Sequence, residues 1–551
     1  MTFAMPALGF ILASLLIGFA WLSPIHTYPW VTFSSELASF AAGVALLTLC
    51  LKQPIKIPRA QLWMFAIAIV PLLQWCFGLI SDFSVAFLSF SYLLMFWLML
   101  LCGYNLALQT EKREQMMQYF SCLLLVVALL SSLMALIQWL NLESLFHGVV
   151  MQFKANRPYA NFGQPNNLAT FLIMGLLGAL YLYEKNKVTV WLLMPASLLV
   201  LFSICLTQSR TSWLVCVFIL VYWTIKHYRK PVRLKLTKLL LWCAAFVAIG
   251  TYLLPLLTQL VVSDLGTGVA QTASMVDRAS RGHERLGMWM QILHAIAERP
   301  WAGYGWNQTS IAVFESIQFN TIPVWFNSAH NVLLDLLVWN GVLLGSVIIG
   351  YMTIWLYWLN KNAKDTTSIV VLLMVGTILI HAMLEFPQRY AYFLLPLGFL
   401  LGLIQAQSPN LKGLTLHHNV LRGVGVIALV LLLLIWRDYK LFQDNSRLLF
   451  KHKPPSTEIL GSSQIMLLTQ FEQRLDWIAL SPKTIMPDAD LTVLAEMVKN
   501  KATPYNLKKY AQLLAFNQKF TEAEQQLLVL QKLHKQKMSL AEMIELNQQV
   551  K

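Results

Sequence analysis

The sequence predicts an all-α polytopic membrane protein that ends in a small helical domain. Of its 551 residues, 57% are hydrophobic and only 12% are charged, whereas soluble domains carry about a quarter charged residues. The apolar residues form runs that approach the length of a membrane-spanning helix, which is about 20 residues. Polar residues gather in a long segment between Pro255 and His330 and in residues 438–551.

About thirteen segments are predicted to span the membrane. No basic region precedes the first one, so we expect it to remain as a span and not to be cleaved as a signal peptide. The segments at 167–183 and 211–226 are short for a span. The predicted spans are 5–24, 33–51, 61–80, 85–108, 119–140, 167–183, 188–206, 211–226, 237–257, 331–358, 367–385, 390–406 and 420–436.

These spans divide the chain into three predicted parts: N-terminal spans at 1–140, a core at 141–437 that contains a polar loop at 258–330, and a C-terminal domain at 438–551. In the last part, two amphipathic helices begin near Thr503 and Thr521. The pair resembles one hairpin of tetratricopeptide type, and an ordinary helical bundle explains the pattern equally well.

Basic residues set the predicted topology. The net charge of +15 could suggest binding to nucleic acid, but the basic residues lie mostly in short loops between apolar runs. The loops richest in Lys and Arg, above all residues 226–238, share one side, which the positive-inside rule makes cytoplasmic. An odd number of spans then places the polar loop and the C-terminal domain on the opposite, outer side.

The seven cysteines lie in or beside apolar segments. No pair of cysteines occurs outside the predicted spans, so we expect neither a disulfide nor a cysteine–histidine metal site. His381 and Glu385 have the spacing of metal ligands on a helix, but no third ligand is apparent. We therefore predict that the protein binds no metal.

His330 closes the polar loop just before an apolar segment, and Asn327, Ser328 and Asn331 flank it. One interpretation is an interfacial histidine that bonds to a backbone carbonyl. The other is an imidazole that receives a proton from an attacking hydroxyl or orients that hydroxyl. The flanking polar residues and the arginines of the same loop favour the second interpretation.

Four arginines on the predicted outer side are candidates for binding an anion. Arg210 lies in a tight turn, where it either snorkels at a helix end or holds phosphate oxygens through two parallel hydrogen bonds. Arg285 is expected on a helix with Trp289 one turn later, which also fits an interfacial amphipathic helix. Arg278 and Arg281 have the same options.

Polar residues also border two of the spans. Gln164, Asn166 and Asn167 follow Arg157 in an amide-rich stretch that either caps a helix or binds sugar hydroxyls. Glu385 is followed by Arg389. A buried ion pair of these two would be structural, whereas a carboxylate that orients a catalytic group would be functional.

Three motifs together resemble the O-antigen ligase superfamily of bacterial lipid-linked glycan transferases. They are RLGMW at 285–289, PWAGYG at 300–305 and HNVLLD at 330–335, and the resemblance covers about residues 190–406. The segment at 157–170 is similar to one typical of PglL-type protein O-oligosaccharyltransferases. The C-terminal extension also resembles that group.

The resemblance implies a GT-C-type glycosyltransferase of the bacterial inner membrane that works without a cofactor. It would transfer a glycan from undecaprenyl diphosphate to a serine or threonine of a periplasmic protein, often a pilin. The catalytic residues would be His330, Arg210 and Arg285. The candidates for substrate binding are Arg157, Gln164, Asn166, Asn167, Arg278, Arg281, Glu385 and Arg389.

Two alternatives differ from this hypothesis. A lipopolysaccharide O-antigen ligase or an O-antigen polymerase differs only in its acceptor, and the 157–170 segment and the C-terminal domain argue against it. A transporter or flippase would place charges or broken helices at the middle of the bilayer, related by an internal repeat. Neither feature is apparent, because the polar residues gather at one face.

Overall fold

The computed structural model describes residues 7–50, 53–153, 156–228, 232–265, 283–320, 322–451 and 464–548. These residues are mostly helical, and among them one antiparallel sheet pairs β1 (Ile55–Pro58) with β2 (Gly413–Leu416). In its register Ile55 lies opposite Leu416. The predicted all-α class is therefore confirmed.

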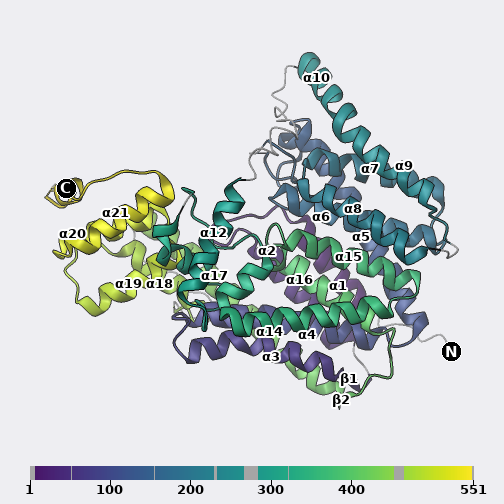
Figure 1. Cartoon of the computed structure of the whole chain (residues 1–551), viewed down its shortest axis with the longest axis horizontal. Helices are drawn as coiled ribbons and strands as arrows, with labels where there is room; N and C mark the ends of the chain where they lie inside the picture. The colour runs from purple at the N-terminus through teal and green to yellow at the C-terminus, as the bar shows by residue number, and fades with distance from the viewer. Residues whose placement is uncertain are drawn as a thin grey trace. The chain divides into compact units, whose positions relative to one another are not determined.

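A helix occurs at each of the thirteen segments predicted to span the membrane. Within the described ranges, eight of these helices are long and apolar enough to cross a bilayer, and four more are apolar but shorter. A multi-pass membrane protein is thus confirmed, while the number thirteen stays a prediction. The helices are α1 (Ala7–Leu22), α2 (Phe33–Ala45), α3 (Arg59–Cys76), α4 (Phe83–Leu106), α5 (Thr110–Trp139), α6 (Pro165–Glu184), α7 (Val190–Thr207), α8 (Arg210–His227), α9 (Leu236–Ala248), α14 (Val332–Asn362), α15 (Thr366–Ala382), α16 (Ala391–Gln405) and α17 (His418–Phe450) (Figure 1).

The helix at 237–257 is longer than predicted. α9 continues through a π-helical turn (Ile249–Leu253) into α10 (Leu254–Leu265). Pro255 has no N–H to donate within this long helix. The helix tolerates it because Pro255 lies in the first turn of α10, directly after the π-helical turn shifts the hydrogen-bond register. The polar loop therefore begins later than the hydropathy pattern indicates.

The chain divides into two compact units. Unit 1 comprises residues 1–65, 94–279 and 354–432, and unit 2 comprises residues 66–93, 280–353 and 433–551. In unit 1, α6 packs against α5, α7 and α15, and α15 also packs against α8 and α16. Short turns join α7 to α8 and α15 to α16, so the N-terminal ends of α6, α8 and α16 meet the C-terminal ends of α7 and α15.

Unit 2 joins part of the polar loop to the C-terminal helices. One hydrophobic core contains Met288 and Trp306 from the loop together with Trp477 and Leu530 from the C-terminal part. The additional helices of this unit are α12 (His283–Glu298), α13 (Thr309–Glu315), α18 (Thr469–Ala479), α19 (Asp488–Asn500), α20 (Pro504–Phe516), α21 (Phe520–His534) and α22 (Leu540–Gln548). The predicted boundaries at 140 and 437 stay predictions; α17 runs unbroken past residue 437.

The PWAGYG motif packs its main chain against a kink in α14. Gly341 breaks the helical geometry there with a φ of 72°. The Val342 N–H donates to the Pro300 carbonyl at 2.7 Å, and the Tyr304 N–H donates to the Val338 carbonyl at 2.8 Å. At Gly303 a Cβ atom would lie 2.6 Å from the same Val338 oxygen. This motif therefore needs glycine because two backbones approach each other closely.

Replacing Gly303 by alanine is expected to destabilise unit 2 by about 1–3 kcal/mol. Its φ of 68° is unfavourable for a residue with a Cβ atom, and the added methyl group would overlap the α14 backbone. Thermal unfolding of the purified protein in detergent measures the effect. Gly350→Ala is the matched control, because nothing lies within 4 Å of its added Cβ. Equal melting temperatures for both variants would contradict the close packing described above.

Candidate active site

His330 lies in a left-handed backbone conformation, with a φ of 51°, at the end of the loop before α14. Its N–H donates to the Ser328 hydroxyl at 3.2 Å. Asn331 caps α14, because its side-chain oxygen accepts hydrogen bonds from the N–H groups of Leu333 and Leu334. The cap of α14 is therefore Asn331.

Asp335 holds this loop in place, although the sequence did not single it out as a site residue. Its fully buried carboxylate accepts hydrogen bonds from the Ser328 hydroxyl at 2.7 Å and from the Ala329 N–H at 2.8 Å. The Thr309 hydroxyl also donates to it at 3.0 Å. The two residues that precede His330 are thus fixed by one buried carboxylate.

Arg285 is on α12, which the structure ties to the same loop. The indole N–H of Trp289 donates to the Ala329 carbonyl at 2.9 Å. Arg285 lies one turn before Trp289, as the sequence predicts, and it is half-buried. Arg278 and Arg281, the other candidate arginines of this segment, lie outside the described residues.

The amide-rich stretch of unit 1 meets Glu385. The side-chain amides of Gln164 and Asn166, at the start of α6, donate to the two oxygens of Glu385 at 3.4 and 3.3 Å. Glu385 follows α15 and is only 6% exposed. Residues that the sequence suggested separately, as sugar-binding amides and as an orienting carboxylate, therefore form one polar cluster.

A second row of polar contacts lies one turn deeper between α6, α15 and α16. Asn167 donates to the Tyr392 hydroxyl at 3.2 Å, and the Thr170 hydroxyl is 2.9 Å from Nδ1 of His381. All four side chains are buried. His381 therefore belongs to the packing between helices, next to the Glu385 cluster.

Arg157, from the segment before α6, contacts the turn between α7 and α8 that leads to Arg210. The guanidinium of Arg157 donates to the Thr207 carbonyl at 3.3 Å. Gln208 ends α7 in a left-handed conformation, Ser209 follows, and exposed Arg210 is the first residue of α8. The predicted tight turn is therefore present, and it lies next to a second candidate arginine.

Arg389 follows Glu385 by four residues, just before α16. Its guanidinium is 5.8 Å from the ring centroid of Phe386, in the short 3₁₀ turn before α16. Glu36, which the sequence did not single out, is 3% exposed and accepts a hydrogen bond from the Ala391 N–H at 2.6 Å. It anchors the start of α16 beside the polar cluster.

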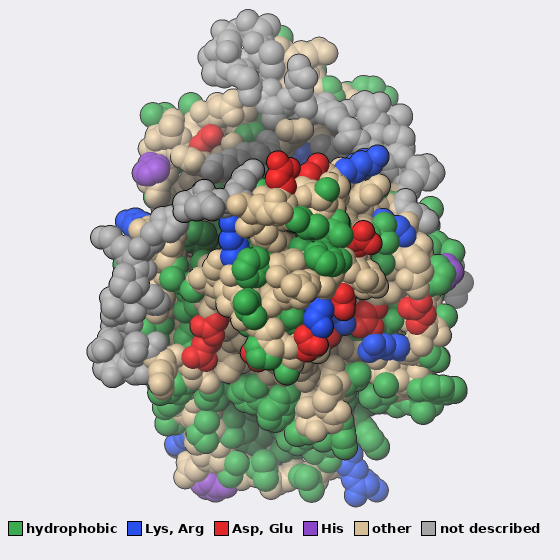
Figure 2. Space-filling model, turned by 90° about the vertical axis from the view of Figure 1, so that its left-hand side faces the viewer, with side chains coloured by type: hydrophobic (Ala, Val, Ile, Leu, Met, Phe, Trp, Pro, Cys, Tyr) green, Lys and Arg blue, Asp and Glu red, His purple; other side chains and the backbone are tan. Residues whose placement is uncertain are grey.

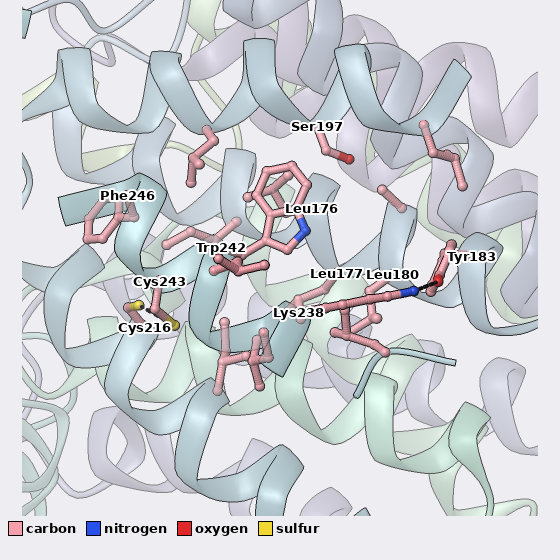
Figure 3. Close-up of a pocket in the computed structure, with 18 of the residues that line it drawn as sticks. Leu176, Leu177, Leu180, Tyr183, Ser197, Cys216, Lys238, Trp242, Cys243 and Phe246 are labelled. Carbon is pink, nitrogen blue, oxygen red and sulfur yellow. Dashed lines mark hydrogen bonds between the residues drawn. The ribbon is translucent and has the colours of Figure 1, made fainter. Parts of the chain in front are cut away.

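An apolar cavity of about 400 Å³ lies among α6, α7, α8 and α9 (Figure 3). Ser212 and Phe246 line one end, and Tyr183 and Lys238 line the other, where the ammonium of Lys238 donates to the Tyr183 hydroxyl at 3.1 Å. Ser212 is two residues beyond Arg210. The cavity therefore runs from the end of the bundle that carries Arg210 towards the opposite end.

Among the described residues no group of three or more His, Cys, Asp or Glu side chains is arranged to hold a metal ion. Unit 1 presents Arg210 at the start of α8 and a buried carboxylate with two amides. Unit 2 presents Arg285 on α12 and an imidazole on a loop that Asp335 fixes. These groups can bind an anion, bind hydroxyls and accept a proton.

Family comparisons agree with this chemistry. Residues 195–349 match the O-antigen ligase family, residues 158–183 match the protein glycosylation ligase family, and residues 369–547 match the C-terminal part of a family described as virulence factor membrane-bound polymerase. No solved structure matches the chain. The multi-pass helical fold and these matches define a membrane glycosyltransferase of the O-antigen ligase type.

Two relatives narrow the assignment. The general O-oligosaccharyltransferase of Acinetobacter baylyi is 52% identical over 537 residues, which cover 98% of this chain and 94% of that protein. The ComP-specific O-oligosaccharyltransferase of the same organism is 29% identical over 407 residues, which cover 73% and 72% of the two chains. The chain therefore belongs to the O-oligosaccharyltransferase family.

Proposed function

We propose that this protein transfers an oligosaccharide en bloc from undecaprenyl diphosphate to serine or threonine hydroxyls of periplasmic or pilin-like proteins. The near full-length similarity to a general O-oligosaccharyltransferase carries this proposal. The convergence of Gln164 and Asn166 on Glu385 supports it, because these amides belong to the segment that resembles protein-glycosylating enzymes.

Arg210 and Arg285 are assigned to the diphosphate. A guanidinium offers two parallel donors that match phosphate oxygens. Arg210 is also the first residue of α8, where the free N–H groups and the helix dipole favour an anion. As the sugar–phosphate bond breaks, negative charge grows on the diphosphate, so positive charge there stabilises the transition state.

His330 is assigned to the acceptor hydroxyl. The hydroxyl oxygen attacks the anomeric carbon while the bond from that carbon to the diphosphate oxygen breaks, which inverts the carbon. The electron pair of the broken bond leaves with undecaprenyl diphosphate, and His330 takes or guides the hydroxyl proton. The Asp335 network fits this task, since it fixes the backbone on which the imidazole is carried.

The remaining contacts are assigned to binding. Glu385, with Gln164 and Asn166, offers acceptors and donors to hydroxyls of the glycan or of the acceptor. The cavity beside Arg210 offers an apolar path for the polyprenyl tail of the donor, because Ser212 and Phe246 line its end close to that arginine. Transfer of an isoprenoid chain from water into the cavity would gain about 25 cal/mol per Å² of apolar surface. Transfer from the lipid bilayer would gain less.

The proposal is tested by transfer in vitro from purified lipid-linked glycan to an acceptor protein. Mass spectrometry should find the intact glycan on serine or threonine of the acceptor. In cells, periplasmic proteins should lose the glycan when the gene is deleted, which a gel-mobility shift reports. If the gel mobility of the periplasmic proteins is unchanged by the deletion, the proposed protein acceptor is contradicted.

Lipopolysaccharide ligation or O-antigen polymerisation is the second candidate function, because two of the matching families carry O-antigen ligase and polymerase descriptions. The acceptor distinguishes them. If deletion changes the size of lipopolysaccharide and leaves periplasmic proteins unchanged, then the acceptor is a lipid or a growing glycan.

The C-terminus is expected to be periplasmic. The reasons are the odd number of predicted spans and the basic loops on the opposite side. Alkaline phosphatase fused after Lys551 should be active, whereas the same enzyme inserted after Lys187, in a predicted cytoplasmic loop, should be inactive. The reverse pattern would invert the predicted topology and with it the shared outer face of the candidate residues.

A further inference from the structure

Three cationic residues, Arg474, Lys501 and Lys509, lie near Trp477 in the C-terminal helices. Arg474 lies one turn before Trp477 on α18. The ammonium of Lys509 on α20 donates to the carbonyls of Trp477 and Ile478 and lies 4.7 Å from the Trp477 ring centroid. Figure 2 is viewed from the side on which these helices lie and shows basic and acidic side chains among hydrophobic ones.

Lys501 joins the same group through Asn506. The indole N–H of Trp477 donates to the Asn506 side-chain oxygen at 3.1 Å, and the Asn506 amide donates to the Lys501 carbonyl at 2.8 Å. Lys501 directly follows α19. Two hydrogen bonds therefore fix the end of α19 against α18, and Arg474, Lys501 and Lys509, here called the cation cluster, come from three different elements.

The cation cluster has no acidic partner among the described residues. In the described C-terminal helices, ion pairs join Lys499 to Glu496 and Glu315, and Lys519 to Asp488, but none includes a member of the cluster. Lys509 is 9% exposed, and Arg474 and Lys501 are half-buried. Lysine and arginine are almost never buried unless they are paired.

This arrangement costs free energy in the absence of an anion. Burial and, to a smaller extent, the nearby charge of Arg474 together lower the pKa of Lys501 to about 8. Burial also lowers the pKa of Lys509 to about 8. Charged groups in such a place are destabilising unless an opposite charge or a full set of hydrogen bonds compensates them. Lys509 already has two carbonyl acceptors, so the opposite charge is needed mainly beside Arg474 and Lys501, where a bound anion would supply it.

We propose that the cation cluster is a binding site for an acidic side chain of the protein acceptor. Tyr505 lies beside the cluster: it is 51% exposed, its ring centroid is 5.8 Å from the Lys509 ammonium, and it interacts electrostatically with Arg474. Exposed tyrosine next to arginine is typical of protein-binding surfaces. The identity of the partner rests on the proposed function, whereas the affinity for a carboxylate does not.

The test uses the full-length protein in detergent and a fluorescein-labelled peptide in which glutamates flank a serine. Fluorescence anisotropy should show that the glutamate peptide binds and that its glutamine counterpart binds at least tenfold more weakly. Lys501→Gln and Arg474→Gln should each weaken the glutamate peptide about tenfold, the usual effect of losing one hydrogen bond to a charged group. Lys501→Arg, which keeps the charge, should retain binding.

Lys537→Gln is the matched control, because it removes the same charge from an exposed position that has no recorded contact. Equal losses in Lys537→Gln and Lys501→Gln would overturn the site in favour of a general charge effect. Stronger competition by inorganic phosphate or by phosphatidylglycerol vesicles than by the glutamate peptide would also overturn it, since the ligand would then be a phosphate. Melting temperatures show whether a variant has simply unfolded.

Glycan transfer separates this inference from the proposed function. With an acidic acceptor, Lys501→Gln is expected to raise KM and leave kcat unchanged. If the wild-type protein transfers no glycan to protein, the proposed function fails while peptide binding can still be measured. If transfer occurs and Lys501→Gln, Arg474→Gln and Lys537→Gln all bind the peptide like the wild type, the inference fails alone.

Discussion

Replacement of His330 by alanine is expected to lower the rate of glycan transfer by about 10²–10⁴-fold, the usual contribution of a general base or acid. The physical reason is that the attacking hydroxyl is a weak nucleophile until its proton is received or directed. Transfer from purified lipid-linked glycan to an acceptor protein, at matched protein level, is the measurement. Near-normal transfer would mean that His330 only stabilises the loop.

Two further variants make this result specific. Asparagine adopts the left-handed conformation of His330 readily, so His330→Asn keeps the backbone and loses only the imidazole. It should be nearly as inactive as the alanine variant if the proton must be received, and partly active if the hydroxyl is only oriented. His147→Ala, at an exposed position, controls for the loss of a histidine and should transfer normally.

Loss of Arg210 or Arg285 is expected to be nearly as severe. Alanine at either position should lower kcat by about 10²–10³-fold, the effect of removing one donor from a developing negative charge. Lysine should recover only part of the activity, because an ammonium lacks the planar pair of donors that holds a phosphate. Wild-type rates for both lysine variants would refute the assignment to the diphosphate.

Combining Arg210→Ala with Arg285→Ala shows whether the two arginines act on the same diphosphate or on different groups. If both arginines stabilise the same diphosphate, the double alanine variant should lose less than the product of the single losses. Arg447→Lys, an exposed pair partner of Asp444, is the control and should be unaffected. EDTA is expected to change little, since positive side chains supply the electrostatic stabilisation. Strict dependence on a divalent ion would instead direct attention to His381 and Glu385.

Local features of the site could be predicted from the sequence. Arg285 and Trp289 are on one helix as their spacing indicates, and the stretch from Asn327 to Asn331 forms the loop end before α14. Such features depend on neighbouring residues alone. The partner of Gln164 and Asn166 could not be predicted, because Glu385 is more than 200 residues away and only the packing of α6 on α15 brings them together.

Residues whose role depends on contacts with distant segments were the hardest to interpret from the sequence. Asp335 lies within an apolar helix and looks like an ordinary first-turn acidic residue, and its three hydrogen bonds come from other segments. Asn340-Gly341 is a turn dipeptide inside an otherwise apolar run, and only the structure shows that the kink there is bonded to the PWAGYG backbone. Lys501 and Arg474 appear in the sequence as solvated charges, and only the tertiary fold shows that they lack acids.

The union of PWAGYG with the α14 kink has a consequence for how this enzyme can diversify. The two segments are joined by backbone hydrogen bonds, and these bonds do not depend on which side chains the neighbouring positions carry. Apart from the glycines and the side chains that hold the loop, such as Trp289, Ser328 and Asp335, residues of the loop can therefore change from one lineage to another without displacing the frame that presents Arg285 and His330. Selection can retune the preference for glycan or acceptor by exchanging side chains, while the chemistry is inherited intact.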